Sequence, residues 1–471
     1  MLDKNQASDI FQRIRKLSSA DELEVLFYGG SSALTRFANN VIHQNVSEEN
    51  VVVSVRTAFG QKTARATTNK LDDDSLKRVV QASESLARVQ EPNPDLLPMP
   101  APHEAYENRG ERSEEPHVHP PVPSRHFERT AKVGPEERAA AVKQIVAIAE
   151  KHKLTTAGIY SISSLVEGIF NSHGVAEWHR QTGAEVSISM LANNSSGWQK
   201  ANSPDVTQIH PIELAEIAAK KAIESRDPHE IPAGKYTVIL EPAAVLDMVG
   251  FMFFDFSGIA ILDQRSFLNN RIGTKLFGDN VSIWDDVAHP LQSGTPFDGE
   301  GMRRQRVHLV EYGRPNRVVY ARASAAKMAQ SEYRDKVGAI EPTGHGFPIP
   351  NEMGEAPMNI VFATPEDPKT IEQMIASTER GLLVTRLWYI REVDPYEKIL
   401  TGMTRDGTFY IEEGNIEYGA RNFRFNESLI HMLSNVEQMG TPVRASGEES
   451  FDMVVPAMKI RGFNFTEVTR F

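Results

Sequence analysis

The chain has 471 residues, with 63 acidic and 51 basic side chains and a formal net charge of −12. This charge argues against nucleic-acid binding, which depends mainly on Lys and Arg neutralising phosphates. The absence of cysteine excludes disulfides, thiolate zinc ligands, iron–sulfur clusters and a cysteine nucleophile. No uncharged apolar run approaches the ~18 residues that span a bilayer, and residues 1–20 lack the apolar stretch of a secretory signal. We therefore expect a cytoplasmic protein that binds neither nucleic acid nor membrane.

The first half of the chain mixes helical and strand-like periodicity. Apolar residues at helical spacing predict helices over 8–18 and 71–89, and strand-like runs occupy 24–28 and 50–56. Residues 91–124 contain nine prolines, which indicates a surface linker or excursion. His117 and His119 lie in this segment, and we interpret them as part of a solvated loop rather than as metal ligands.

The pattern continues with a helix over 134–151, alternating strand-like residues over 157–192 and a helix over 211–224. A boundary near residue 229 precedes a strand over 236–240 and a helix over 241–251. The rest is rich in turns and strands, with late helices predicted over 366–380 and 427–440. Because regular βαβ alternation is missing, we expect an α+β fold with helices packed on antiparallel or mixed sheets. We divide it into an N-terminal α+β domain (1–229) and a strand-rich C-terminal domain (230–471).

Motif chemistry by itself identifies no active site, since no HExxH, P-loop or GxSxG motif occurs. Asp406-Gly407 within residues 404–408 is typical of a hairpin turn, and Glu413-Gly414 predicts a second tight turn before residues 416–418. A stand-alone hydrolase would need another constellation, such as Asp298, Glu300 and His345 converging within about 3 Å.

Five short sequence motifs, spread in order over nearly the whole chain, resemble those of a known family. They are 35–40 (TRFANN), 296–301 (PFDGEG), 404–409 (TRDGTF), 421–428 (RNFRFNES) and 456–460 (PAMKI). Together they resemble the TldD/PmbA family, also called modulators of DNA gyrase. The resemblance implies a two-part, dimerising α+β protein. It also implies pairing between a zinc-bearing TldD-type subunit and a PmbA (TldE)-type subunit, which together trim unstructured peptides in a closed chamber.

The zinc subunit of that family carries His-Glu-x-x-x-His on a helix, with a late cysteine as third ligand. The matching positions here are Leu246, Asp247 and Phe251, and the chain has no cysteine. The resemblance therefore implies the PmbA (TldE)-like branch, with no metal or catalytic group in this chain and zinc in a partner.

We therefore expect a non-zinc subunit that pairs with a TldD-type chain, or with itself, and handles unstructured peptides. Two loops are predicted to contact the peptide, through Asp298, Glu300, Thr404, Arg405 and Asp406. Two alternatives stay open: the stand-alone hydrolase, and a non-catalytic peptide-binding protein of the same fold.

Overall fold

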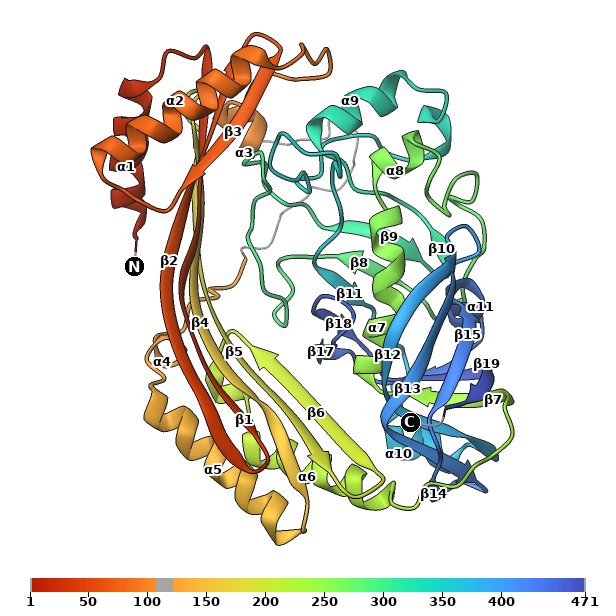
Figure 1. Ribbon diagram of the computed structural model, residues 1–471. Helices are drawn as coiled ribbons and strands as arrows, with labels where there is room; N and C mark the ends of the chain where they lie inside the picture. Colours follow the sequence, from red (N-terminus) through yellow and green to blue (C-terminus); the bar gives the residue numbers. More distant parts are fainter. Residues whose placement is uncertain (1, 107–121, 470–471) are drawn as a thin grey trace.

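The structure is a computed structural model that describes residues 2–106 and 122–469. Its N-terminal half is built on one curved antiparallel sheet (Figure 1), in the order β3-β2-β1-β4-β5-β6. The strands are β1 (Glu22–Ala38), β2 (Val41–Phe59), β3 (Lys62–Thr68), β4 (Thr155–Asn171), β5 (Ala176–Leu191) and β6 (Ser196–Ser203). Four of them run for 16 to 19 residues, so the sheet is much longer than it is wide.

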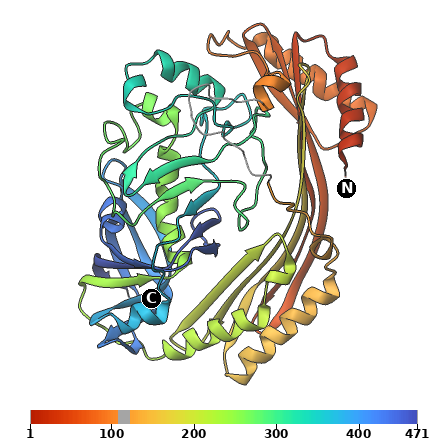
Figure 2. The same cartoon turned by 180° about the vertical axis from the view of Figure 1, so that it is seen from behind.

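Helices cover the convex face of this sheet at both of its ends (Figures 1 and 2). Side chains alternate between the two faces of a strand, so Ala184, Val186, Ile188 and Met190 of β5 all lie in one apolar core with α5 and α6. A second core joins α1 and α2 to the other end of the sheet. The helices are α1 (Lys4–Leu17), α2 (Asp73–Val89), α3 (Pro102–Tyr106), α4 (Glu128–Ala131), α5 (Pro135–Lys151), η1 (Val206–Gln208) and α6 (Pro211–Glu224).

The C-terminal half contains two further sheets. One is ordered β10-β9-β8-β11-β18-β17 and the other β12-β7-β19-β15-β13-β14, with β16 paired to β19. Their strands are β7 (Gly234–Leu240), β8 (Ile283–Asp285), β9 (Val307–Glu311), β10 (Arg314–Pro315), β11 (Ile360–Phe362), β12 (Arg380–Asp394), β13 (Ile399–Glu412), β14 (Asn415–Gly419), β15 (Phe423–Ser428), β16 (Val436–Met439), β17 (Val443–Ala445), β18 (Met453–Val455) and β19 (Met458–Val468).

The helices of this half are short. They are α7 (Pro242–Val249), η2 (Gly250–Asp255), α8 (Gly258–Leu262), α9 (Arg322–Gln330), η3 (Arg334–Lys336), α10 (Ile371–Ala376) and α11 (Leu429–Ser434). Residues of α7, of both sheets and of the connecting loops share one large apolar core. This core holds α7 in place between the two sheets.

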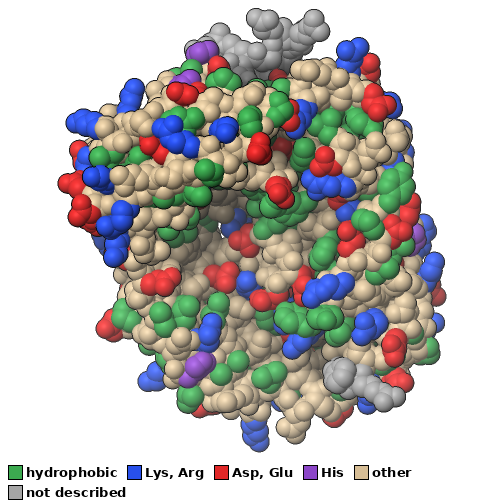
Figure 3. Space-filling view, turned by 45° about the horizontal axis from the view of Figure 1, so that its top comes forward, with side chains coloured by type: hydrophobic (Ala, Val, Ile, Leu, Met, Phe, Trp, Pro, Cys, Tyr) green, Lys and Arg blue, Asp and Glu red, His purple; other side chains and the backbone are tan. Residues whose placement is uncertain are grey.

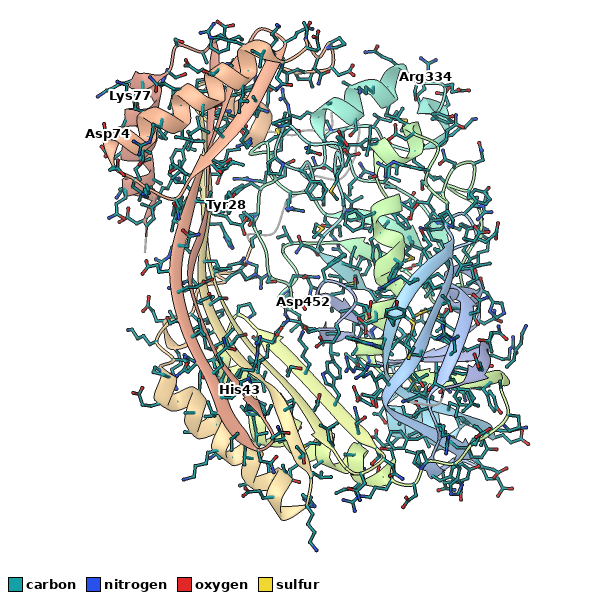
Figure 4. All side chains as sticks on the ribbon, in the orientation of Figure 1. Tyr28, His43, Asp74, Lys77, Arg334 and Asp452 are labelled. Carbon is teal, nitrogen blue, oxygen red and sulfur yellow. The ribbon has the colours of Figure 1, made fainter. Side chains whose placement is uncertain are left out.

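The two halves face each other across the concave side of the first sheet. Leu26, Ile169 and Val175 of that side pack against Phe297 and Met302. The halves also meet through polar contacts, such as Lys200 with Gly447 and Ser196 with Asp406. Away from these contacts the space-filling view is hollowed (Figure 3), and Tyr28 and Asp452 lie on opposite sides of the space (Figure 4).

The α+β prediction is confirmed, and so are the five helices predicted between residues 8 and 251. The two late helices are much shorter than predicted, at six residues each. The first begins only at Ile371, where the Thr370 side chain caps it, and ends at Ala376, shortly before the chain pairs with β13 from Arg380 and with β7 from Gly381. Val436–Met439 likewise pairs with β19. Strand pairing over long sequence distances thus overrides the local helical pattern.

The predicted hairpin turn at 404–408 is wrong. Asp406 and Gly407 do adopt positive φ, at 55° and 125°, but within the continuous strand β13. The pairing of β13 with β12 shifts register between Val384 and Arg386, so the two residues form a bulge instead of a chain reversal. The true turn is at Glu413-Gly414, as expected, between β13 and β14.

Part of the proline-rich segment, residues 107–121 with His117 and His119, lies outside the described residues. Within the described part of that segment, α3 is helical and Asn171 Nδ2 donates to the carbonyl of Pro100 at 2.8 Å. No helix among the described residues is long and apolar enough to cross a membrane.

Candidate functional site

Helix α7 is the element on which the zinc ligands of the resembled family would stand. It follows β7 directly, and Pro242 at its first turn suits the fixed φ of proline. Leu246 is fully buried in the main core, and Phe251 of η2 packs against the same core. Neither side chain has a donor atom for a metal, so these positions do not fit zinc.

The one carboxylate on α7, that of Asp247, forms hydrogen bonds with the protein backbone. Asp247 is fully buried, and its Oδ1 accepts hydrogen bonds from the backbone N–H groups of Glu448 (3.2 Å) and Glu449 (3.0 Å). Its Oδ2 has no hydrogen-bond partner among the described residues. Burial raises the pKa of Asp247 to about 7, against the lowering effect of the two amide contacts. Asp247 therefore anchors the loop over residues 446–452.

This anchored loop in turn connects to the concave face of the first sheet. Lys200 of β6 donates to the carbonyl of Gly447 at 3.1 Å and lies 3.6 Å from the carboxylate of Glu448. Asn202 Nδ2 donates to Asp452 Oδ2 at 2.6 Å. The loop thus bridges α7 and the N-terminal sheet at the edge of the hollow.

A cavity of about 310 Å³ lies beside this bridge. Its walls are residues of β4, β5 and β6 on one side and Ser293, Arg444 and Asp452 on the other. Arg444 is held in place by Ser293 Oγ (3.0 Å) and Asp452 Oδ2 (3.1 Å). The sheet side presents small or hydroxylated residues, among them Ser161, Ser163 and Gly183.

Because the pKa of Asp247 is raised in the folded chain, the free energy of unfolding should depend on pH. An unfolded aspartate ionises near 3.8, whereas the folded one ionises near 7. The stability that neutral Asp247 supplies is therefore complete below pH 4 and lost as the pH rises through 7. An asparagine at this position does not titrate and still offers a carbonyl oxygen to both amides. We expect Asp247→Asn to gain up to about 4 kcal/mol more unfolding free energy at pH 8 than at pH 4, relative to wild type.

Urea unfolding of both chains at the two pH values measures this difference. An Asp247→Asn effect that is the same at pH 4 and pH 8 would contradict the assignment.

The predicted hydrolase constellation does not assemble as proposed. His345 Nε2 lies 3.0 Å from Asp285 Oδ1, and both side chains are fully buried. Asp298 Oδ1 accepts from the amides of Glu300 and Met302, both at 2.9 Å, and its Oδ2 accepts from the amide of Gly346 at 2.8 Å. The histidine thus pairs with a different carboxylate, and Asp298 holds a turn.

Burial also bears on Asp298 and Glu300 as peptide contacts. They are 5% and 4% exposed, and burial raises the pKa of both carboxyl groups. Glu300 also contacts Arg322, whose backbone amide lies 3.3 Å from Glu300 Oε1. Glu300 is among the residues that line a cavity of about 180 Å³. Contact of Asp298 and Glu300 with a peptide stays a prediction.

Residues 404–408 lie at the seam between the two halves. Thr404 is buried and accepts from the amide of Phe423 at 3.0 Å. Asp406 is 6% exposed, accepting from Ser196 Oγ at 2.6 Å and pairing with the guanidinium of Arg386. Arg405 is the accessible member of the three, with its side chain 47% exposed. Its guanidinium lies 4.9 Å from the ring centre of Trp388.

A second cavity, of about 650 Å³, opens at this seam. Polar residues from both halves form most of its lining, including Ser195, Ser196, Asp406, Thr408 and Asn422. The 404–408 segment therefore contributes to a cavity through Asp406 and Thr408, whereas Thr404 is not among its lining residues.

Sequence reasoning missed the charged side chains that join the halves, namely Lys200, Arg386 and Arg444. Lys200 donates to the carbonyl of Gly447, and Arg444 contacts Asn202. The guanidinium of Arg386 lies 4.8 Å from the ring centre of Trp198. No local spacing could have signalled them. Among the described residues, no group of three or more His, Asp or Glu side chains is arranged to hold a metal ion.

Three family models match: PmbA/TldA metallopeptidase domain 1 over 23–87, the central domain over 128–226 and the C-terminal domain over 233–467. The chain is 23% identical to Metalloprotease PmbA of Escherichia coli O157:H7 over 418 residues, covering 84% of this chain and 82% of that protein. It is 22% identical to a PmbA homolog of Haemophilus influenzae, over 87% and 85% of the two chains.

Two solved structures share the fold. One is described as a putative modulator of a DNA gyrase from Thermotoga maritima, with a TM-score of 0.83, 19% identity and coverage of 98% of this chain and 100% of that chain. The other is TldE from Thermococcus kodakarensis, with a TM-score of 0.81, 18% identity and coverage of 98% and 99%. The family models together match most of the chain, on a fold that both structures share. The chain belongs to the PmbA/TldD metallopeptidase family.

Proposed function

We propose that this chain is the non-zinc subunit of a TldD-type metallopeptidase complex that trims unstructured peptides in the cytoplasm. The observation that carries the proposal is helix α7. Its two histidine-equivalent positions, Leu246 and Phe251, are apolar and packed in or against the main core, and Asp247 is engaged by two backbone amides. These residues offer zinc no ligand set, which supports the proposal that another chain holds the metal.

Placing the zinc in one subunit and the peptide-binding surface in the other explains two observations together. Relatives are named metalloproteases, yet α7 here lacks the donors that such chemistry needs. If a TldD-type partner supplies the zinc and its activated water, this chain needs to supply only shape and binding surface. A related structure is that of a protein named TldE, which is consistent with such a subunit.

The concave sheet and the 446–452 loop suit a role in holding peptides. The cavity of about 310 Å³ between them has small and hydroxylated walls, such as Ser161, Ser163 and Gly183. Such walls leave room for varied side chains while hydroxyl groups hydrogen-bond the main chain. A broad peptidase needs this combination, because its substrates share only their backbone.

A reconstitution assay tests the proposal. An unstructured peptide is incubated with this chain, with a TldD-type chain carrying His-Glu-x-x-x-His, and with both. We expect no cleavage by this chain alone and cleavage by the mixture well above that of the partner alone. A chelator should abolish it, and a stably folded protein should resist it.

Two results would overturn the proposal. Cleavage by this chain alone would mean that it has its own active site. A mixture that binds peptide but gains no cleavage would mean that the chain is a non-catalytic peptide-binding protein.

A further inference from the structure

Three neighbouring strands of the C-terminal half bring basic side chains to one cavity. The strands lie side by side in the order β12-β7-β19 (Figure 1). Arg380 begins β12, Lys235 lies near the start of β7, and Arg461 belongs to β19. All three line a cavity of about 460 Å³, which shares no lining residue with the cavities described above. Sheet pairing thus gathers cations that are far apart in the sequence.

The strand register explains why the two arginines meet at this cavity. Gly381, next to Arg380, pairs with Thr237 of β7. The pairing of β19 with β7 shifts register at residues 461–462, opposite the same threonine, where Gly462 has a φ of 75°. A bulge of this kind redirects the side chains beside it. The parallel and antiparallel neighbours of β7 therefore present one guanidinium each at the same level of the sheet.

The positive charges of this cavity are poorly compensated by the protein. Among the described residues that line it, none is Asp or Glu. Arg461 approaches the carboxylate of Glu437 only to 3.9 Å. Glu412 faces Arg380 across the β12–β13 pair, but within the described part of the chain neither Arg380 nor Lys235 forms a salt bridge. In a chain of net charge −12, such a local excess of positive charge favours an anionic ligand.

We propose that this cavity binds the phosphate group of a small molecule, through Lys235, Arg380 and Arg461. The planar fork of a guanidinium matches phosphate oxygens two at a time, and a lysine ammonium adds a compact charge. Three cations suit the several oxygens of a phosphate better than the two oxygens of a carboxylate.

The shape of the cavity agrees with this ligand. A Cβ atom at Gly234 would meet nothing within 4 Å, and one at Gly462 would meet only His431 Cε1, at 3.9 Å. Both glycines line the cavity, so a ligand can approach the backbone closely. A volume of about 460 Å³ is typical of pockets for small organic ligands. The cavity therefore has room for an organic group bonded to the phosphate.

Calorimetric titration of the full chain at low ionic strength tests the site with four probes: inorganic phosphate, adenosine monophosphate, adenosine and acetate. We expect one phosphate per chain, with an affinity that falls as salt is added because exposed charges are screened. Adenosine should not bind, and acetate should bind at least about tenfold more weakly than phosphate. Tighter binding of adenosine monophosphate than of phosphate would identify a phosphate ester as the ligand, and equal or weaker binding would identify free phosphate. Failure of both phosphate compounds to bind, or acetate binding as tight as phosphate, would overturn the proposal.

Matched variants separate this site from general attraction by surface charge. Arg380→Gln and Arg461→Gln should each weaken phosphate binding by roughly tenfold or more. Arg334→Gln is the control, since its side chain is 62% exposed against 70% for Arg461. Arg334 lies beside α9, away from β7 and β12 (Figures 1 and 4), and its loss should change the affinity by less than about twofold. Equal effects of the three substitutions would contradict the proposal.

Lys235 provides a test that compares a conservative change with a reversal of charge. The residue is exposed, so neither Lys235→Arg nor Lys235→Glu should shift the urea midpoint of unfolding. Lys235→Arg should keep phosphate binding, and Lys235→Glu should abolish it because a carboxylate then faces the ligand. Unchanged binding in Lys235→Glu would overturn the assignment. Peptide cleavage in the reconstitution assay is a separate readout, so failure of this site leaves the proposed function to its own test.

Discussion

A chain carrying Leu246→His is expected to lose roughly 4 kcal/mol of unfolding free energy and to gain no zinc. Leu246 is fully buried in the main core. Its replacement forfeits about 2 kcal/mol of apolar burial and buries an imidazole without a designed partner, at about 1–3 kcal/mol. The restored histidine would stand on α7 without a second histidine at Phe251 and without the cysteine of the zinc branch.

Urea unfolding and the zinc content of the purified variant measure both effects. Leu246→Met, which keeps the apolar volume, should cost less than about 1.5 kcal/mol and serves as the control. A Leu246→His chain of unchanged stability that holds one zinc per molecule would contradict our account of α7.

The second large effect is expected from Asp406→Asn, at about 3 kcal/mol of unfolding free energy. The Arg386 side chain is 7% exposed, and its Nε donates to Asp406 Oδ2 at 2.7 Å. Removing one partner of a buried ion pair leaves the other charge uncompensated. Asparagine is the fitting replacement because it tolerates the φ of 55° at this position, so the effect reports the charge rather than backbone strain.

A neighbouring arginine provides a control for this prediction. Arg405 Nε lies 3.7 Å from the same carboxylate oxygen, but its side chain is 47% exposed. Arg405→Gln should therefore change stability by no more than about 1 kcal/mol. The double variant Arg386→Met, Asp406→Asn should recover much of the loss, since it leaves no unpaired buried charge. Equal losses of unfolding free energy in Asp406→Asn and Arg405→Gln would contradict the role of the buried Arg386–Asp406 ion pair.

Local patterns predicted what depends on neighbouring residues. The helical spacing of apolar residues placed α1, α2, α5, α6 and α7, and Glu413-Gly414 was correctly taken as a turn. Asp406-Gly407 shows the limit of such reasoning. Its positive φ values follow from the residue types, but whether they form a turn or a bulge depends on the register with β12. Pairing with distant strands also explains why the two late helices are shorter than local spacing predicts.

At the candidate site, too, some residues could be identified from the sequence and others could not. The resemblance identified the positions on α7, and the structure shows what replaces the ligands there: core packing at Leu246 and an amide clamp at Asp247. It could not indicate the bridge through Lys200 and Arg444, because Lys200 contacts Gly447, 247 positions away, and Arg444 contacts Asn202, 242 positions away. Nor could it show that Asp298 and Glu300 are buried, since both occur in a loop-like, glycine-rich phrase.

The metal content of the purified chain tests the central claim most directly. It is measured together with cleavage of an unstructured peptide by the chain alone, with and without a chelator. The account predicts no stoichiometric zinc and no chelator-sensitive cleavage until a TldD-type partner is added. One zinc per chain, or chelator-sensitive cleavage by the isolated chain, would mean that the ligands lie elsewhere and would contradict it.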